Sequence, residues 1–196
     1  MRIRSIPRKR SIFLSVRNFS AQYSCILTRH PGVENAVTRE CFEIVREETR
    51  STLKDDEVEV ETVCLSVDPY MRCRFDGETH PQLPQYVTPF LLNTPLDGGG
   101  VGKIVRSASP RYQPDDYIVL PFVGYPWKTR CVLKVSNESD GSSSKLDTFH
   151  VAADEIDENQ LSHLLGAIGM PGLTAYCGIV RSIRTVSYTH LRAHET

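Results

Sequence analysis

The segment from Leu165 to Ile179, LGAIGMPGLTAYCGI, constrains the architecture of this chain more than any other. Gly166, Gly169 and Gly172 alternate there with apolar residues, and Pro171 interrupts the pattern. We therefore expect a closely packed helix that is broken near the proline and lets another backbone approach. Such a helix normally packs against a substantial domain. Few residues follow Ile179 in the 196-residue sequence, so we interpret the segment as a hinge toward a second domain that this sequence lacks.

Composition restricts the class of protein further. With 40% hydrophobic residues and a net charge of −1, the sequence predicts one large or two small globular domains and argues against a nucleic-acid partner. It contains no apolar run of about eighteen residues, so we expect no membrane span. The cysteines lack C-x-x-C spacing, which argues against a zinc lobe and favours reduced, mostly buried thiols. They are Cys25, Cys41, Cys64, Cys73, Cys131 and Cys177.

Residues 1–22 form a basic N-terminal extension. Six arginines and one lysine precede the first carboxylate, Glu34. Serines and apolar residues alternate with the arginines, and the sequence Arg17–Ser20 resembles a matrix-protease cleavage site. Two interpretations remain open, a mitochondrial transit peptide and a basic tail, native or mistranslated, with no targeting role.

Short strands separated by turns are predicted from Tyr23 onward. The clearest is Glu57–Val67, where Val58 and Val60 alternate with glutamates on the opposite face. Strands at such short intervals favour a small barrel or sandwich, with helix entering mainly from about Asp157. The other expected strands are 23–28 and 41–45, which should pair, and 97–105, 116–120 and 131–135.

Two glycine and histidine patterns do not carry the chemistry they first indicate. Gly98–Gly102 departs from a phosphate loop, because only three residues separate its bounding glycines and Ile104 replaces the metal-binding Ser or Thr. We expect these glycines to let a strand bend or a cofactor approach. His190 and His194 have the spacing of helical metal ligands but no third ligand, so we expect no metal site.

Three loops carry aromatic residues suited to a hydrophobic carbonyl substrate. Asp68-Pro69 turns the chain and presents Tyr70 at the rim of the sheet, and the second loop carries Tyr86. The third loop carries Phe122, Tyr125 and Trp127. Tyrosine hydroxyls can donate hydrogen bonds to a carbonyl oxygen, and aromatic rings can wall an apolar pocket. The alternative is that Trp127 and Phe90 belong to the core and that Tyr70 caps a turn.

The same blocks resemble a known family in sequence order and near-family spacing. LSVDPYMRCR, YVTPF, LDGGGVG, PW and LGAIGMPGLTA are similar to motifs of the zinc-free branch of the medium-chain dehydrogenase/reductase superfamily, and most similar to its prostaglandin reductase 2 group. The resemblance covers about Tyr23 to Ile183. Phe75 stands where Met is usual, two extra residues precede Pro126-Trp127, and the Ser-rich stretch 136–147 is an unusual insert.

The resemblance implies a fold and a domain order. Residues 23–163 would be the GroES-like catalytic domain, mainly β with a C-terminal helix and built as a partly open β-barrel. Residues 164–184 would be the hinge helix and the start of a Rossmann domain that is otherwise missing. Residues 185–196 depart from the family and resemble translated sequencing adapter, so we expect a non-native tail. A natural tail from alternative splicing is the other interpretation.

The resemblance also implies an activity and its residues. The family uses NADPH, without metal, to reduce the carbon–carbon double bond of α,β-unsaturated ketones such as 15-oxoprostaglandins. Hydride reaches the β-carbon, and a neutral tyrosine hydroxyl can stabilise the resulting enolate. Tyr86 matches the family's substrate-contacting tyrosine and is the candidate catalytic residue. The other implied site residues are Phe122, Tyr125 and Tyr70 for substrate, and Met170 and Pro171 beside the nicotinamide.

Three hypotheses about the product follow. The chain is an incomplete, inactive part of an NADPH-dependent enone reductase, or a non-catalytic barrel that binds lipid or pairs with a full-length subunit. The third is an alkenal or quinone reductase of the same superfamily. The family implies a small hydrophobic carbonyl substrate, a full-length parent that is a monomer or homodimer, and a cytoplasmic location. The basic N-terminus makes the mitochondrial matrix the alternative location.

Overall fold

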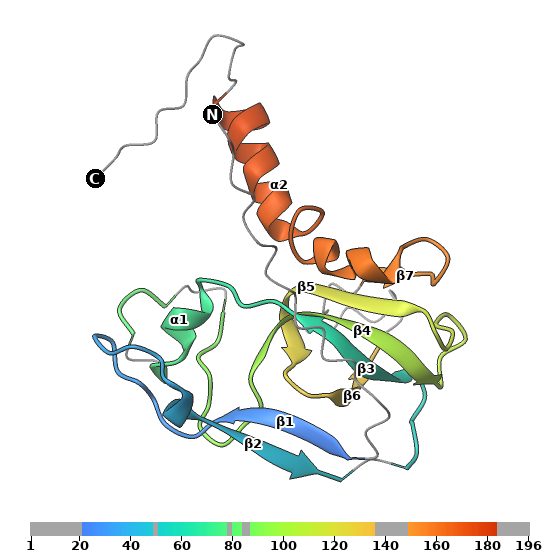
Figure 1. Ribbon diagram of the computed structural model, residues 1–196, viewed down its shortest axis with the longest axis horizontal. Helices are drawn as coiled ribbons and strands as arrows, with labels where there is room; N and C mark the ends of the chain where they lie inside the picture. Colours follow the sequence, from blue (N-terminus) through green and yellow to red (C-terminus); the bar gives the residue numbers. More distant parts are fainter. Residues whose placement is uncertain (1–20, 49–50, 78–79, 84–86, 136–148, 184–196) are drawn as a thin grey trace, which may run out of the picture.

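The structure, a computed structural model, describes residues 21–48, 51–77, 80–83, 87–135 and 149–183. It consists of two antiparallel sheets with a helical arm at the C-terminal end (Figure 1). The elements are β1 (Gln22–Leu27), η1 (Arg39–Cys41), β2 (Phe42–Glu47), β3 (Glu57–Leu65), α1 (Met71–Arg74), β4 (Asp97–Ser107), β5 (Tyr117–Pro126), β6 (Arg130–Lys134), β7 (Phe149–Val151), η3 (Glu158–Leu164), α2 (Met170–Tyr176) and η4 (Cys177–Ile183).

The larger sheet has five strands in the order β6-β3-β4-β5-β7, and β1 and β2 form a separate pair. Two isolated bridges join the sheets, Ser24 to Lys128 and Ile26 to Pro95. Across the described residues this pairing does not close into a barrel. The mainly β fold is therefore confirmed, and its strands form two sheets that are linked by isolated bridges.

The predicted strands are present, and the first two pair as expected. The 3-10 helix η3 begins where helix was predicted, with the Asp157 carboxylate accepting the Asn159 backbone N–H. One side chain on the clearest strand differs from its pattern. Glu59 is buried rather than exposed, and its carboxylate pairs with Arg106 of β4 next to a bulge in β3. The short strand β7 was not predicted.

Two glycines of the Gly98–Gly102 stretch make room for one aromatic side chain. A Cβ atom on Gly100 would overlap the Tyr125 ring, and one on Gly102 would overlap the Tyr125 hydroxyl and lie 2.9 Å from Val60 Cβ. The Tyr125 side chain fills this space and is completely buried in the core cluster of β3, β4 and β6. These two glycines thus accommodate core packing rather than a cofactor.

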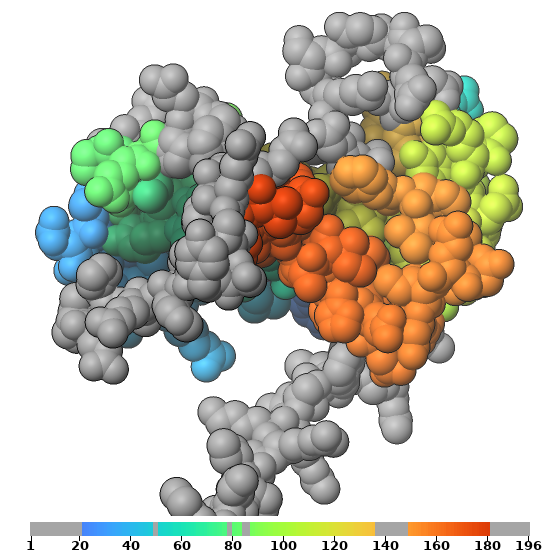
Figure 2. Space-filling view, turned by 90° about the horizontal axis from the view of Figure 1, so that it is seen from above, coloured from blue at the N-terminus to red at the C-terminus, as the bar shows by residue number. Residues whose placement is uncertain are grey.

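The C-terminal arm consists of η3, α2 and η4, and the first part of the arm packs on the larger sheet. Leu161 and Leu165 pack against Val101, Tyr117 and Val119. Figure 2 shows residues 149–170, in orange, over the side formed by β4 and β5, and Figure 1 shows α2 rising away from the sheets.

The predicted break in the arm lies between η3 and α2, and Pro171 stands in the first turn of α2. A Cβ on Gly169 or Gly172 would overlap the backbone of residues 164–167, so these glycines allow a close approach within the arm itself. In the part of the chain that the structure describes, no helix has the length and apolar character to cross a membrane.

Candidate functional site

Two of the predicted site residues, Tyr70 and Phe122, lie against each other at one end of the larger sheet. Their ring centroids are 4.5 Å apart. The Tyr70 hydroxyl donates a 2.7 Å hydrogen bond to the Phe122 backbone carbonyl. The structure thereby joins the first and third aromatic loops, which are 52 residues apart in sequence.

Local sequence explains how both residues reach this position. Asp68-Pro69 turns the chain into α1, with the Met71 N–H donating to the Asp68 carbonyl at 3.0 Å. On β5, the pairing with β4 jumps between Leu120 and Tyr125, so only Gly99 stands opposite residues 121–124. This irregularity interrupts the ladder between β4 and β5 at the position of Phe122. Gly124 has a φ of +91°, a conformation that glycine adopts without strain.

Arg74, at the end of α1, connects this region to the second aromatic loop. Its side chain is only 3% exposed. Its guanidinium donates to the Asp97 carboxylate at 2.5 Å and to the Thr88 carbonyl at 2.7 Å, and its carbon lies 3.9 Å from the centroid of the Phe90 ring. In return, the Phe90 N–H donates to the Arg74 carbonyl at 2.9 Å. The backbone after Tyr86 is thus held by both the side chain and the main chain of one residue.

Asp97 extends the same network to the third loop. Besides accepting from Arg74, its carboxylate accepts the Gly124 N–H at 2.9 Å. One ion pair therefore joins three segments, which we call the rim loops: residues 68–74, 87–90 and 121–127. Sequence reasoning did not single out Arg74 or Asp97. The available signal was weak: Asp97 is the one charged residue of LDGGGVG, but Arg74 is one of three charged residues in LSVDPYMRCR.

Burial raises the pKa of Tyr70 to about 12, and the nearby Arg74 charge only partly opposes this effect. The phenol is consequently neutral over the physiological range and acts as a hydrogen-bond donor. Because the Phe122 carbonyl already accepts the hydrogen bond from the Tyr70 hydroxyl, Tyr70 links residues 68–74 to residues 121–127.

The remaining predicted site residues have different outcomes. Tyr125 is completely buried, and its hydroxyl lies 3.0 Å from Thr62 Oγ1. Burial raises its pKa well above the usual value. A side chain with no exposed surface offers no atom to a substrate, so this placement corrects the substrate role given to Tyr125 and makes it a core residue. Tyr86 lies outside the described residues, as do the basic extension up to residue 20, the Ser-rich insert, the 185–196 tail and the His190/His194 pair.

Met170 and Pro171 begin α2 and are exposed. Immediately before them, a cavity of about 330 Å³ opens between the arm and β5 and β7. Its lining is apolar except for His150 and comprises Val119, Pro121, Phe149, His150, Val151, Leu164, Ile168 and Gly169. Within the described residues no cluster of three metal-binding side chains occurs.

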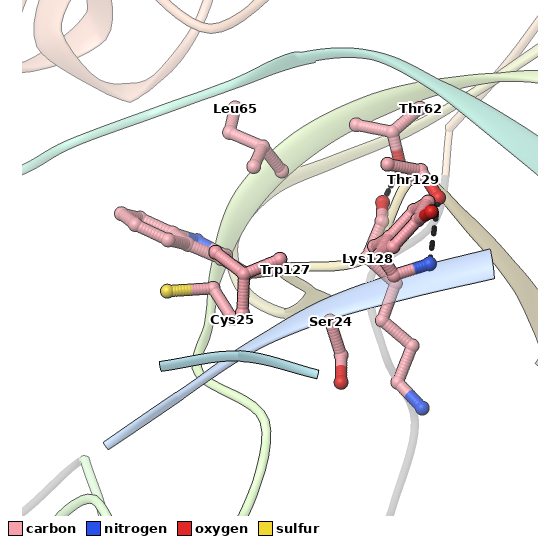
Figure 3. Close-up of a pocket in the computed structure, with 9 residues that line it drawn as sticks. Ser24, Cys25, Thr62, Leu65, Trp127, Lys128 and Thr129 are labelled. Carbon is pink, nitrogen blue, oxygen red and sulfur yellow. Dashed lines mark hydrogen bonds between the residues drawn. The ribbon is translucent and has the colours of Figure 1, made fainter. Parts of the chain in front are cut away.

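A second cavity, of about 240 Å³, lies between β1 and the larger sheet (Figure 3). Trp127 forms one wall of it and also lines a neighbouring cavity beneath α1. In Figure 3 the indole of Trp127 and the thiol of Cys25 lie together, away from the polar side chains of Thr62 and Thr129. Trp127 also packs against the buried cluster that contains Phe90. Both aromatic residues therefore belong to the core, as the alternative interpretation of the sequence predicted.

Comparison with known proteins places this arrangement in a family. A family model described as the N-terminal domain of oxidoreductase matches residues 24–137, a range that includes all three rim loops. The chain belongs to this family. The membership confirms the superfamily predicted from the motifs, the medium-chain dehydrogenases/reductases.

Curated relatives of this oxidoreductase domain are longer proteins. The chain is 32% identical over 136 residues to the NADPH-dependent curcumin reductase of Escherichia coli K12, covering 69% of this chain and 33% of that protein. It is 30% identical over 126 residues to a 2-alkenal reductase (NADP(+)-dependent) of Nicotiana tabacum, covering 63% and 30%. The chain therefore spans about a third of the length of these relatives.

A solved structure shows the same fold for the oxidoreductase domain. The crystal structure of CurA from Vibrio vulnificus superposes with a TM-score of 0.61 and 21% sequence identity, covering 81% of this chain and 40% of that one. At this identity the match supports the fold and not a shared substrate.

Proposed function

We propose that this chain is the substrate-side part of an NADPH-dependent reductase that acts on the carbon–carbon double bond of α,β-unsaturated carbonyl compounds. The observation that carries the proposal is the identity of 30% or more with two relatives whose names state NADP(H)-dependent reduction of curcumin and of 2-alkenals. The family match also spans every rim loop. The family match and the rim loops both support the proposal, which does not rest on the fold alone.

The rim loops support a hydrophobic substrate. Tyr70 and Phe122 present two half-buried aromatic rings at one end of the larger sheet. Phe90 is buried, and its ring packs against the Arg74 guanidinium. Apolar walls with a few fixed hydrogen-bond donors are typical of sites for small organic molecules. A 15-oxoprostaglandin is the substrate that the sequence motifs favour, and 2-alkenals are the alternative that the tobacco relative favours.

The residues of the arm fit one end of a nicotinamide cofactor. The apolar cavity beside Gly169, with the Pro121 backbone at its edge, could receive a flat ring, and Met170 follows directly in the chain. When bound, the nicotinamide would supply hydride to the substrate. A basic cradle for its phosphates is not among the residues that line this cavity, so we assign the phosphates to a further domain of a longer chain.

In this proposal the chain's own residues orient the enone and stabilise charge on its oxygen. Phe122, tethered by Tyr70, packs against the apolar body of the substrate. Tyr86, which directly precedes the anchored segment 87–90, donates its hydroxyl hydrogen to the carbonyl oxygen as the enolate forms. The Tyr70 hydroxyl is already used within the rim and is not the acid in this scheme.

The outer face of the arm gives this proposal a second structural basis. Ile168 is 70% exposed, Leu173 61%, Tyr176 55% and Val180 52%. An apolar surface of this kind is expected to be covered in the working protein. We propose that the cofactor-binding domain of a longer chain covers it.

The experiment is a comparison of NADPH consumption by the 196-residue chain and by an extended chain that continues past Ile183 into a cofactor-binding domain. The substrates are a 15-oxoprostaglandin, a 2-alkenal and a quinone. The proposal expects double-bond reduction by the extended chain and none by the short one. Reduction of the quinone alone, or turnover by the 196-residue chain, contradicts it.

In the extended chain, Tyr86→Phe should lower kcat by about tenfold or more, because one oxyanion donor is lost. Tyr125→Phe is the matched control, since this buried hydroxyl faces Thr62 and should leave kcat unchanged. Equal kinetics for Tyr86→Phe and the unaltered protein would remove Tyr86 from its role.

A further inference from the structure

We propose that Arg74 is a positioning residue that sets the spacing of the three rim loops through its ion pair with Asp97. This inference rests on the proposed function for its catalytic consequence, whereas its structural content can be tested on the chain itself. Neither residue is required to touch substrate.

The geometry of the pair differs from that of the other ion pairs in the described residues. Arg74 is 3% exposed, while the arginine and lysine partners of the other pairs range from 20% to 61%. A buried guanidinium that lost its carboxylate would be left with an uncompensated charge, which is strongly unfavourable. The ion pair is therefore expected to hold a single geometry, in which the guanidinium of Arg74 faces the carboxylate of Asp97. That geometry fixes the positions of the segments that are hydrogen-bonded to these two side chains.

Each rim loop has its own attachment to the pair. Residues 68–74 carry Arg74 itself, and residues 87–90 are bonded to its guanidinium through the Thr88 carbonyl. The Phe90 N–H adds a bond to the Arg74 backbone carbonyl, which does not depend on the ion pair. Residues 121–127 are bonded through the Gly124 N–H on the Asp97 carboxylate. Thr88 and Phe90 follow Tyr86 closely in sequence, and Gly124 follows Phe122 closely. Phe122, which is proposed to contact substrate, is thus carried on a segment whose position depends on Arg74 and Asp97.

Arginine suits this task better than lysine. Its planar guanidinium can donate in several directions at once, and here Nε reaches Thr88 while Nη2 reaches Asp97. A lysine would offer one ammonium and could keep the charge pair, but it could not hold both partners in the same geometry. Arg74→Lys should therefore release residues 87–90 while retaining the Gly124 attachment.

The test is native-state amide hydrogen exchange of the 196-residue chain, read by mass spectrometry. Arg74→Met should raise exchange in residues 87–90 and 121–127 by about tenfold or more, with the central amides of β3 and β4 unchanged. Arg72→Met is the matched control on the same helix. Because Arg72 donates to Asp76 and to the carbonyls of Gly32, Val33 and Asn35, it should release residues 32–35 and leave the rim protected.

A uniform rise in exchange over the whole chain would mean that Arg74 only stabilises the fold, and this outcome overturns the proposal, as does an unchanged rim. If Arg74→Met does not fold, Arg74→Lys provides the same readout, with faster exchange expected in 87–90 but not at Gly124. In the extended chain, Arg74→Lys should lower kcat at least fivefold while KM changes less, because the segment that follows Tyr86 is released and the segment that carries Phe122 is retained. An inactive extended chain would count against the proposed function and leave the exchange result standing.

Discussion

The packing of Tyr125 against two glycines allows a quantitative prediction about the core. A Cβ on Gly102 would overlap the Tyr125 hydroxyl oxygen and crowd Val60. Neither Gly100 nor Gly102 has a positive φ, so alanine costs stability there through steric overlap and not through backbone strain. Overpacking of a closed core typically costs about 1–3 kcal/mol, and the lower entropy of the unfolded alanine chain returns about 0.4–1 kcal/mol. Gly102→Ala should therefore destabilise the chain by about 1.3 kcal/mol, the midpoint of a range of about 0–2.6 kcal/mol.

Removing the hydroxyl should rescue this variant in part. Tyr125→Phe loses the hydrogen bond with Thr62 and a weaker one with the Cys131 thiol, and should cost about 1 kcal/mol by itself. In the Phe background, Gly102→Ala should cost about 0.5–1.5 kcal/mol less than in the native background, a normal coupling for residues in contact. The contact with Val60 remains, so the rescue should be incomplete.

Gly100→Ala is the matched control, because its Cβ would meet Cγ, Cδ1 and Cβ of Tyr125, atoms that phenylalanine keeps. It should show no coupling to Tyr125→Phe. The assay is urea unfolding followed by the fluorescence of Trp127, the only tryptophan in the sequence. Additive free energies for Gly102→Ala and Tyr125→Phe, or equal coupling for both glycines, would refute the packing argument.

Three further predictions concern single side chains. Tyr70→Phe should lower the free energy of urea unfolding by about 1 kcal/mol, because it removes the bond to the Phe122 carbonyl; an unchanged midpoint contradicts this. At pH 8 a thiol reagent should label the exposed Cys177 first and leave Cys131 unlabelled until unfolding, because burial raises the pKa of Cys131 to about 12. Early labelling of a Cys177→Ser variant at Cys131 would oppose it. The hydrogen bond from His150 lowers the pKa of Asp116, so its stabilisation is present above about pH 4 and is lost as the pH falls below that value. Asp116→Asn should flatten this part of the acid unfolding curve, and identical curves would exclude the contribution.

Much of the fold could be predicted because the relevant signals are local. The alternation of Val58 and Val60 indicates a half-buried strand, and Pro171 indicates a break in a helix. Closure of the sheets could not be predicted in this way, since it depends on which strand edges meet. The two bridges between β1 and the residues around Pro95 and Lys128 have no local sequence signature.

The candidate site was predicted less completely, for the same physical reason. Tyr70 and Phe122 were found because aromatic residues in turn-rich loops often reach the surface. Tyr125, three positions along, has the same local signal, and only the facing glycines on β4 determine that it turns inward. Arg74 was missed because a single arginine in a loop is normally solvated, and its burial depends on Asp97, which is 23 residues away.

The most direct test of the central claim is the transfer of hydride from NADPH to the β-carbon of an enone by the extended chain, followed with deuterium-labelled cofactor. The account predicts a saturated ketone that carries one deuterium at that carbon, and no product when the 196-residue chain is used alone. Deuterium at the carbonyl carbon with the double bond intact, or reduction by the 196-residue chain alone, would contradict it.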